Sequence, residues 1–427
     1  MEALDRAIED GAAHAFEFLR ALVSAPSVVG SEQQALEVFE TEMQALGLTT
    51  SRLPFSNEPA TDPRAGVTQR AARLTEDRFQ LLATTPGEGD LTLLLNGHMD
   101  VVPASTPELW TTPPFEPECR DGRMYGRGTA DMKSGFAIGA LALRALRQVR
   151  PDLFAERRLG FLAVIEEECT GNGTLTSLAE HGVSAPEVVL LEPTDLGLMV
   201  GGVGVLWVDL HVVASSAHAH ESQAHANAVD LGLRLVTALR AWSTEVGASE
   251  PEPSMDEGAS AYNVNLGQVR AGDWTSSSPA LAVLGVRVGY PRAWTAEQAE
   301  SAVRDVVAEV VATDPDFPVP PRVECSGLRA RGYLLDDTSA LVRDLSAAHL
   351  DAHGVVPATF SLGSTTDART YLNDFDIPAV CFGAVTQNMH GIDEHVELRS
   401  IVDAARTLAR FLLMRFDPDH DLGGGDR

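Results

Sequence analysis

The sequence contains few cysteines, few basic residues and no long apolar run. Basic residues number 32 against 61 acidic ones, for a net charge of −29. So negative a chain is a poor partner for nucleic acids or anionic membranes, because both require a positively charged contact surface. Its four cysteines lack C-x-x-C spacing, so we expect free or buried thiols in a reducing compartment: Cys119, Cys169, Cys325 and Cys381.

Apolar runs also stay well below the ~18 residues that a membrane-spanning helix requires. Residues 1–5 show neither the basic start nor the apolar core of a signal peptide. We therefore expect a cytoplasmic protein without a membrane partner.

A length of 427 residues predicts two domains. Apolar strands alternate with helical segments over most of the chain, which predicts an α/β fold with a mostly parallel sheet sandwiched by helices. Between residues 204 and 319 the pattern changes to strand, helix, two strands and helix, which predicts a small α+β domain with an antiparallel sheet. The larger domain is then discontinuous, formed by 1–203 and 320–427.

Candidate metal-binding side chains follow the predicted strands. The apolar run Leu91–Leu95 leads to His98, and Asp100 lies two residues further, where its carboxylate can accept the second ring N–H. Asp131 lies in a Gly-rich segment further along the chain. Because open α/β sheets place their sites at the carboxyl ends of strands, we expect these side chains to meet.

Three consecutive glutamates, Glu166, Glu167 and Glu168, follow a second apolar run and precede the turn at 171–173. So many carboxylates at a strand end are electrostatically costly unless cations lie among them. The alternative is a solvated acidic turn, which is common in an acidic chain. Glu192 follows a third apolar run, and His390 follows a fourth.

Together and in this order, these segments resemble the M20 metallopeptidase family, which includes acetylornithine deacetylases, succinyl-diaminopimelate desuccinylases, aminoacylases and glutamate carboxypeptidases. The resemblance implies a zinc-peptidase-like catalytic domain with an inserted lid and dimerisation domain. It also implies two Zn²⁺ ions per subunit, with Co²⁺ or Mn²⁺ as possible substitutes, and a cis peptide between Asp131 and Met132. The implied ligands are His98 and Glu192 on one ion, Glu168 and His390 on the other, and Asp131 bridging both.

The same resemblance implies that Glu167 is the general base, with Asp100 supporting His98. The pair Glu166 and Glu167 could instead serve as base and ligand. We favour Glu167 and Glu168 because their spacing to the Gly-x-Gly turn at 171–173 matches the family's Glu-Glu-x-x-Gly-x-Gly.

The stretch 215–220, followed by Asn227, resembles a signature of the family's lid. It implies that His218 reaches the partner subunit's active site in a homodimer and binds the substrate carbonyl oxygen. The match is incomplete, because His225 occupies a position where glycine is usual. The alternative is a His-rich exposed loop.

Arg369, in a segment resembling the family's Gly-rich loop, could bind a substrate carboxylate or instead pair with Asp367. Asn263 is a second candidate for substrate binding, and the weaker candidates are Arg287, Arg329 and Arg331. The segment 276–279 replaces the Asn-Val-Ile-Pro of relatives with dicarboxylic substrates, which argues against desuccinylase specificity. The chain looks closest to the acetylornithine-deacetylase-like deacylases.

These features predict a hydrolase that cleaves the amide bond of an N-acyl amino acid or a small peptide-like substrate. Two zinc ions would activate the attacking water, and Glu167 would act as general base. The alternatives are an N-carbamoyl amino acid amidohydrolase, and a dipeptidase or carboxypeptidase with the same metal core. A non-enzymatic binding protein is a further alternative, but such a relative should have lost ligands or the base.

Overall fold

A computed structural model describes residues 1–55, 62–68, 77–222, 224–252, 255 and 261–417. Its larger sheet runs in the order β1-β2-β6-β3-β7-β15-β8-β13, with β14 paired to β8. The centre of this sheet, from β6 to β15, is parallel. The pairs β1–β2, β2–β6, β15–β8 and β8–β13 are antiparallel, whereas β14 is parallel to β8. The strands are β1 (Thr49–Pro54), β2 (Phe79–Thr84), β3 (Leu93–His98), β6 (Leu159–Val164), β7 (Val188–Leu190), β8 (Leu198–Gly202), β13 (Tyr333–Leu334), β14 (Thr359–Leu362) and β15 (Ala379–Cys381).

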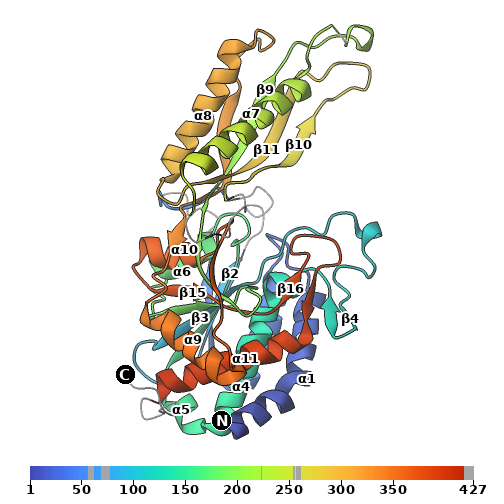
Figure 1. The fold of residues 1–427 in the computed structure, drawn as a ribbon. Coiled ribbons are helices and arrows are strands. Elements are labelled where there is room, and N and C mark those ends of the chain that lie inside the picture. Colours follow the sequence, from blue (N-terminus) through green and yellow to red (C-terminus); the bar gives the residue numbers. More distant parts are fainter. Residues whose placement is uncertain (56–61, 69–76, 223, 253–254, 256–260, 418–427) are drawn as a thin grey trace.

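Helices cover both faces of this sheet, which explains why its central strands are continuous apolar runs. In β3, Leu93 and Leu95 belong to one apolar cluster, and Leu94 belongs to the other. The first cluster lies under α1 (Glu2–Ser24), α2 (Gln33–Ala45), α4 (Ser134–Val149), α5 (Pro151–Glu156), α9 (Ala340–His353) and α11 (Leu398–Phe416). The second lies under α6 (Asn172–Ala179) and α10 (Ala368–Asp374) (Figure 1). The predicted mostly parallel sheet between helices is confirmed.

The lid contains a four-stranded antiparallel sheet in the order β10-β11-β9-β12, as expected for the α+β insertion. Its strands are β9 (Gly204–Val213), β10 (Val264–Ala271), β11 (Leu281–Tyr290) and β12 (Arg322–Ala330). One face packs on α7 (Ala228–Ser249) and α8 (Ala296–Thr313), and buried and half-buried residues alternate along β11 accordingly. The lid was predicted to end at residue 319. Its sheet also includes β12, which starts three residues later, at Arg322.

Both lid helices begin with side-chain caps. Asn227 caps α7 in a capping box with Asp230, and Thr295 caps α8 in another with Gln298. These reciprocal hydrogen bonds satisfy backbone N–H groups that a helix start leaves without partners.

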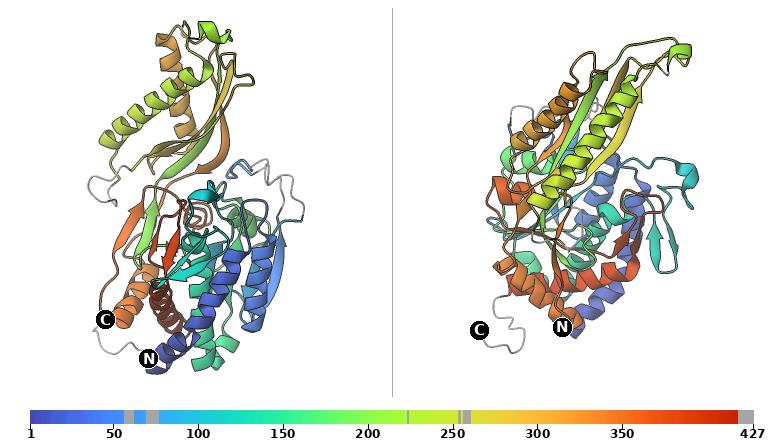
Figure 2. Two further views of the ribbon diagram at one scale, coloured as in Figure 1. Left: turned by 90° about the vertical axis from the view of Figure 1, so that its right-hand side faces the viewer. Right: turned by 45° about the horizontal axis from the view of Figure 1, so that its top comes forward.

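Two strands connect the lid to the larger domain (Figure 2). On one side β8 continues through Val203 into β9, and on the other side β12 leads to β13. The two connections pair with each other on both sides of the crossing, Gly202 with Tyr333 and Val205 with Ala330.

A third, small antiparallel sheet borders the candidate site, in the order β16-β17-β5-β4. Its strands are β4 (Glu118–Arg120), β5 (Arg123–Tyr125), β16 (Thr386–Gln387) and β17 (His395–Glu397), and short helical turns occupy Pro107–Leu109, Thr129–Lys133 and Ala219–Glu221. Among the helices in the described part of the chain, none is long and apolar enough to cross a membrane.

Candidate metal centre and adjoining cleft

The candidate ligands come from segments that end at one edge of the large sheet. His98 is the last residue of β3, Glu168 follows β6, and Glu192 follows β7. Asp131 lies in the helical turn before α4, and His390 lies in the loop between β16 and β17. Because β3, β6 and β7 are parallel neighbours, their carboxyl ends bring these residues together.

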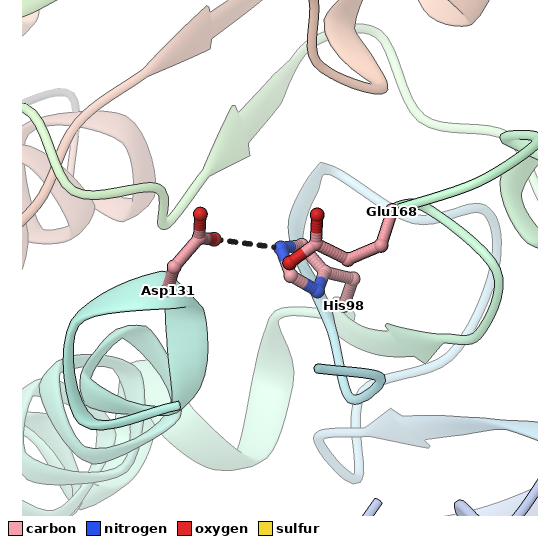
Figure 3. A group of neighbouring side chains, drawn as sticks. All are labelled: His98, Asp131 and Glu168. Atoms are coloured by element: carbon pink, nitrogen blue, oxygen red, sulfur yellow. Dashed lines mark hydrogen bonds and ion pairs between the residues drawn. The ribbon is translucent and has the colours of Figure 1, made fainter. Parts of the chain in front are cut away.

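The carboxylate of Asp131 lies between the two imidazoles. Its Oδ1 is 3.1 Å from Nε2 of His98, and its Oδ2 is 3.3 Å from Nε2 of His390. Each imidazole has a second carboxylate nearby, Glu192 at 3.8 Å from His98 and Glu168 at 3.1 Å from His390. Figure 3 shows His98, Asp131 and Glu168 converging, and their ligand atoms lie within 4.8 Å of one another.

These separations fit the coordination of metal ions. Two ligand atoms at about 2.1 Å from a tetrahedral zinc ion are themselves about 3.4 Å apart. Imidazole nitrogens and carboxylate oxygens are also the donors that Zn²⁺ accepts. The residues therefore form two groups of donors that share Asp131, and each group could hold one cation.

The electrostatics of the site also favour bound cations. Burial and the neighbouring carboxylates raise the pKa of Glu192 to about 8. Burial likewise raises the pKa of Glu167 well above its ordinary value. Burial alone would lower the pKa of His390, but Glu168 and Asp131 raise it to about 11. The site thus concentrates more negative charge than its own side chains neutralise, which a divalent metal ion would offset.

Asp100 differs in detail from the sequence-based expectation. Nδ1 of His98 is 2.9 Å from the backbone oxygen of Asp100, whereas the nearer carboxylate oxygen is 3.7 Å away. The carboxylate instead accepts hydrogen bonds from the backbone N–H groups of Glu167 and Glu168. Asp100 therefore orients His98 through its carbonyl group and holds the acidic segment through its carboxylate.

The three consecutive glutamates have different environments. Glu166 is fully buried, and its carboxylate binds Arg78 at 2.5 Å and the hydroxyl of Thr170 at 2.8 Å. Glu167 faces the candidate centre, with Oε2 4.0 Å from Nε2 of His98, and Glu168 contacts His390. The positive φ of 64° at Glu166 turns the chain between these two directions.

Glu394 and Arg127 support the site but were not singled out from the sequence. Glu394 accepts hydrogen bonds from the backbone N–H groups of Gly128, Ala130 and Asp131, and it forms a buried ion pair with Arg127. This network fixes the turn that carries Asp131. The peptide bond between Asp131 and Met132 is cis, as the resemblance implied. In the sequence, only its position four residues after His390 could have indicated that Glu394 belongs to the site.

The other predicted residues are not among the candidate ligands. His218 is exposed on the lid, where its ring Nδ1 accepts from the backbone N–H of His220 and lies 2.9 Å from Nδ1 of the His220 ring. Arg369 is buried behind Glu167, with Nη2 3.4 Å from Asp367 and Nη1 3.8 Å from Glu167. Asn263 lines the cleft described next.

A cleft of about 1240 Å³ opens between the metal group and the open face of the lid sheet. Glu167, Glu168 and His390 line it on one side, and Asn263, Trp207 and Arg287 line it on the other. Nη2 of Arg287 donates to the carbonyl of Gly363 at 3.2 Å and to the hydroxyl of Ser364 at 3.1 Å. Burial lowers its pKa, and no carboxylate of the described residues lies within ion-pair distance. Arg287 is thus a cation in the cleft with neutral partners.

Comparisons with known proteins find relatives that cover most of the chain. The chain is 30% identical over 405 residues to a succinyl-diaminopimelate desuccinylase of Rhodospirillum centenum, covering 90% of this chain and 92% of the relative. The fold is shared with the dipeptidase Dug1p of Saccharomyces cerevisiae, at a TM-score of 0.79 and 14% identity over 97% of this chain and 98% of the other. It is also shared with human carnosine dipeptidase 1, at a TM-score of 0.78 and 16% identity over the same shares.

A match to a described family covers most of the chain. Residues 94–414 match Peptidase family M20/M25/M40, and this segment includes all the candidate ligands. The chain therefore belongs to peptidase family M20/M25/M40 and is a metal-dependent hydrolase.

Proposed function

We propose that this chain uses two zinc ions to hydrolyse the amide bond of an N-acyl amino acid or a small peptide-like substrate. The observation that carries the proposal is the carboxylate of Asp131, whose two oxygens face His98 and His390 at 3.1 and 3.3 Å. A carboxylate in this position is suited to bridge two cations, each completed by one imidazole and one further carboxylate.

His98 and Glu192 would hold one ion, and His390 and Glu168 the other. When bound, such a pair of ions polarises the substrate carbonyl group and lowers the pKa of water. Co²⁺ or Mn²⁺ would suit the same donors.

Glu167 is suited to transfer a proton from the attacking water to the leaving amine. It lines the cleft and faces the candidate metal ligands, whereas Glu166 forms a buried ion pair with Arg78. Its raised pKa allows it to take a proton from the attacking water and to deliver it to the departing amine nitrogen.

Arg287 is suited to bind the carboxylate of the substrate. A guanidinium group with only neutral hydrogen-bond partners gains most from a carboxylate, because charge-assisted hydrogen bonds are about twice as strong as neutral ones.

Relatives named as a desuccinylase and as dipeptidases support the cleavage of an amide bond. The same site could accept an N-carbamoyl amino acid, which presents a similar carbonyl group.

The lid is suited to form a homodimer. Its edge strand β10 pairs with β11 only among the described strands, and exposed apolar residues lie around it. Val269 is 48% exposed, Leu281 52% and Trp274 72%. In such a dimer His218, which pairs with Ser277 near this edge, could reach the partner's cleft and bind the carbonyl oxygen.

The test combines metal analysis with a substrate panel. We expect about two zinc ions per chain by mass spectrometry and chelator-sensitive hydrolysis of N-acetyl, N-succinyl or N-carbamoyl amino acids, or of dipeptides. The best substrate would define the acyl group and the side chain. A reconstituted protein that binds no metal, or a metal-loaded protein that hydrolyses none of these compounds, would contradict the proposal.

A further inference from the structure

We infer that Lys133 is a positioning residue of the candidate metal centre. Its amino group ties the turn that carries Asp131 to the chain segment that holds the end of β3, where His98 lies. Lys133 does not line the cleft, so it acts through the ligands and not on the substrate. The inference rests on the proposed function, in which Asp131 and His98 bind the same cation.

The composition of the chain draws attention to Lys133. It is the only lysine of the sequence, and the other 31 of the 32 basic residues are arginines. Its side chain is fully buried, which is rare for lysine unless its amino group has partners. In a chain that otherwise uses arginine throughout, a single buried lysine indicates that this position requires the lysine head group.

The amino group of Lys133 binds the end of α1. Nζ donates to the carbonyl oxygen of Leu22 at 2.7 Å and to that of Ala25 at 3.0 Å. In a continuing helix the carbonyl of Leu22 would accept from the N–H of residue 26, but Pro26 has none. Lys133 therefore supplies a donor that the helix end lacks.

The segment that follows α1 holds the end of β3. The hydroxyl of Ser27 donates to the carbonyl of Met99 at 2.7 Å, and the N–H of Val101 donates to the carbonyl of Ser27 at 3.0 Å. The two bonded residues of the strand end flank Asp100, whose carbonyl oxygen lies 2.9 Å from Nδ1 of His98. This segment thus links the end of α1 to the first candidate ligand.

The turn that carries Asp131 is held from two sides. Its last residue, Lys133, donates its backbone N–H to the carbonyl of Gly128 at 2.9 Å and anchors the turn to α1 through Nζ. Glu394 accepts the backbone N–H groups of Gly128 and Asp131. The separation of 3.1 Å between Oδ1 of Asp131 and Nε2 of His98 depends on both anchors.

An arginine would not serve at position 133. A Cβ atom at Gly128 would lie 3.3 Å from Cδ and 3.6 Å from Cε of Lys133, so the stem of the lysine packs closely against the turn. The single Nζ donates to two carbonyl groups, whereas a guanidinium group is wider and planar. A close-packed interior does not accept the larger group without displacing its neighbours.

Zinc affinity of the full chain, measured by competition with a chelator, tests the inference. Lys133→Met keeps an unbranched side chain but removes its donors, and we expect zinc to bind about 10–100-fold more weakly. The absorption spectrum of the Co²⁺-loaded variant should change as well, because it reports on the geometry of the ligands. Wild-type affinity together with a wild-type spectrum would overturn the inference. A wild-type chain that binds no zinc would instead contradict the proposed function.

The matched control is Arg410→Met. Arg410 is a buried cation that pairs with Asp5 near the other end of α1. This variant should lose stability in chemical denaturation but keep the zinc affinity and the Co²⁺ spectrum of the wild type. An equal loss of zinc affinity in Arg410→Met and Lys133→Met would overturn the inference, because any loosening of α1 would then suffice.

Ser27→Ala tests the same connection without changing Lys133, and it serves also if Lys133→Met does not fold. Loss of the hydrogen bond from Ser27 to Met99 should weaken zinc binding by a smaller factor. Unchanged affinity would overturn the inference. The double variant should lose less affinity than the product of the two single losses, because both substitutions interrupt one connection. Independent losses would contradict that connection.

Discussion

The two sheets of this enzyme bury their residues in different ways. The large sheet has helices on both faces, and its charged groups meet at the carboxyl edge, where His98, Asp131 and Glu192 lie. The lid sheet has helices on one face only, so its other face is free to present polar side chains to the cleft. The proposed function therefore assigns bond cleavage to the large sheet and substrate recognition to the lid sheet, so substitutions in each should have separate effects.

The largest expected effect is on catalysis in the larger domain. Glu167→Gln should lower kcat by about 10²–10⁴-fold without changing the metal content, because general acid–base catalysis contributes that much. The matched control Glu166→Gln should lower stability, through loss of its ion pair with Arg78, but keep the turnover of folded protein. The opposite pattern would assign the base to Glu166. Steady-state kinetics and zinc analysis measure both.

The second expected effect is on the stability of the metal-free protein. The pKa of Glu192 is about 8 in the folded chain against an ordinary 4.5, and that of His390 is about 11 against 6.5. In both cases the folded state binds more protons, so stability should fall as pH rises, from about 4.5 to 8 through Glu192 and from about 6.5 to 11 through His390. We expect a loss on the order of a few kcal/mol, measured by chemical denaturation. The zinc-loaded enzyme should lose less, and parallel curves would contradict the assignment of these residues as ligands.

A third expected effect concerns the support of Asp131. Glu394→Gln removes the negative charge that pairs with Arg127 and holds the turn at 128–131. We expect zinc affinity to fall about 10–100-fold, as is usual when a group that orients a ligand is changed. Competition with a chelator measures this affinity. Unchanged zinc affinity would show that the turn keeps its shape without Glu394.

A fourth, smaller effect should appear on the lid side of the cleft. Arg287→Gln should raise KM for a substrate with a free carboxylate by about tenfold, the value of one charge-assisted hydrogen bond. Zinc content should stay unchanged. A carboxamide analogue of the same substrate should respond little to the substitution, and an equal loss for both compounds would exclude Arg287 as the carboxylate partner.

The smallest effect should be confined to the folding of the lid. Asn227→Ala removes the cap of α7 and should cost about 1 kcal/mol. Metal content should not change, because α7 is remote from the ligands in sequence and packs on the lid sheet. Loss of zinc in this variant would show that the two domains do not fold independently.

The sequence predicts the convergence of the candidate ligands where they follow the sheet. His98, Glu168 and Glu192 each follow an apolar strand, and parallel strands bring their carboxyl ends together. The apolar strands themselves are predictable because both faces of the large sheet are buried. The predicted fold is confirmed for these reasons.

The contacts that support the candidate ligands were harder to predict. Glu394 and Arg127 are 267 residues apart, and nothing in their local sequence indicates a pair. Arg287 was only a weaker candidate, because its place in an alternating strand does not show that it lines the cleft. The carboxylate of Asp100 was expected at Nδ1 of His98, but nearby backbone N–H groups compete for it. Local spacing thus predicts which side chains converge better than it predicts the groups that support them.

The crossing between the domains has a mechanical consequence. Its two strands are hydrogen-bonded to each other both below and above the crossing, at Gly202 with Tyr333 and at Val205 with Ala330. A two-stranded ribbon bends readily across its face, but sideways bending would slide one strand along the other and break these bonds. The lid should therefore move relative to the larger domain mainly by bending this two-stranded connection across its face. Motion in other directions should be restricted.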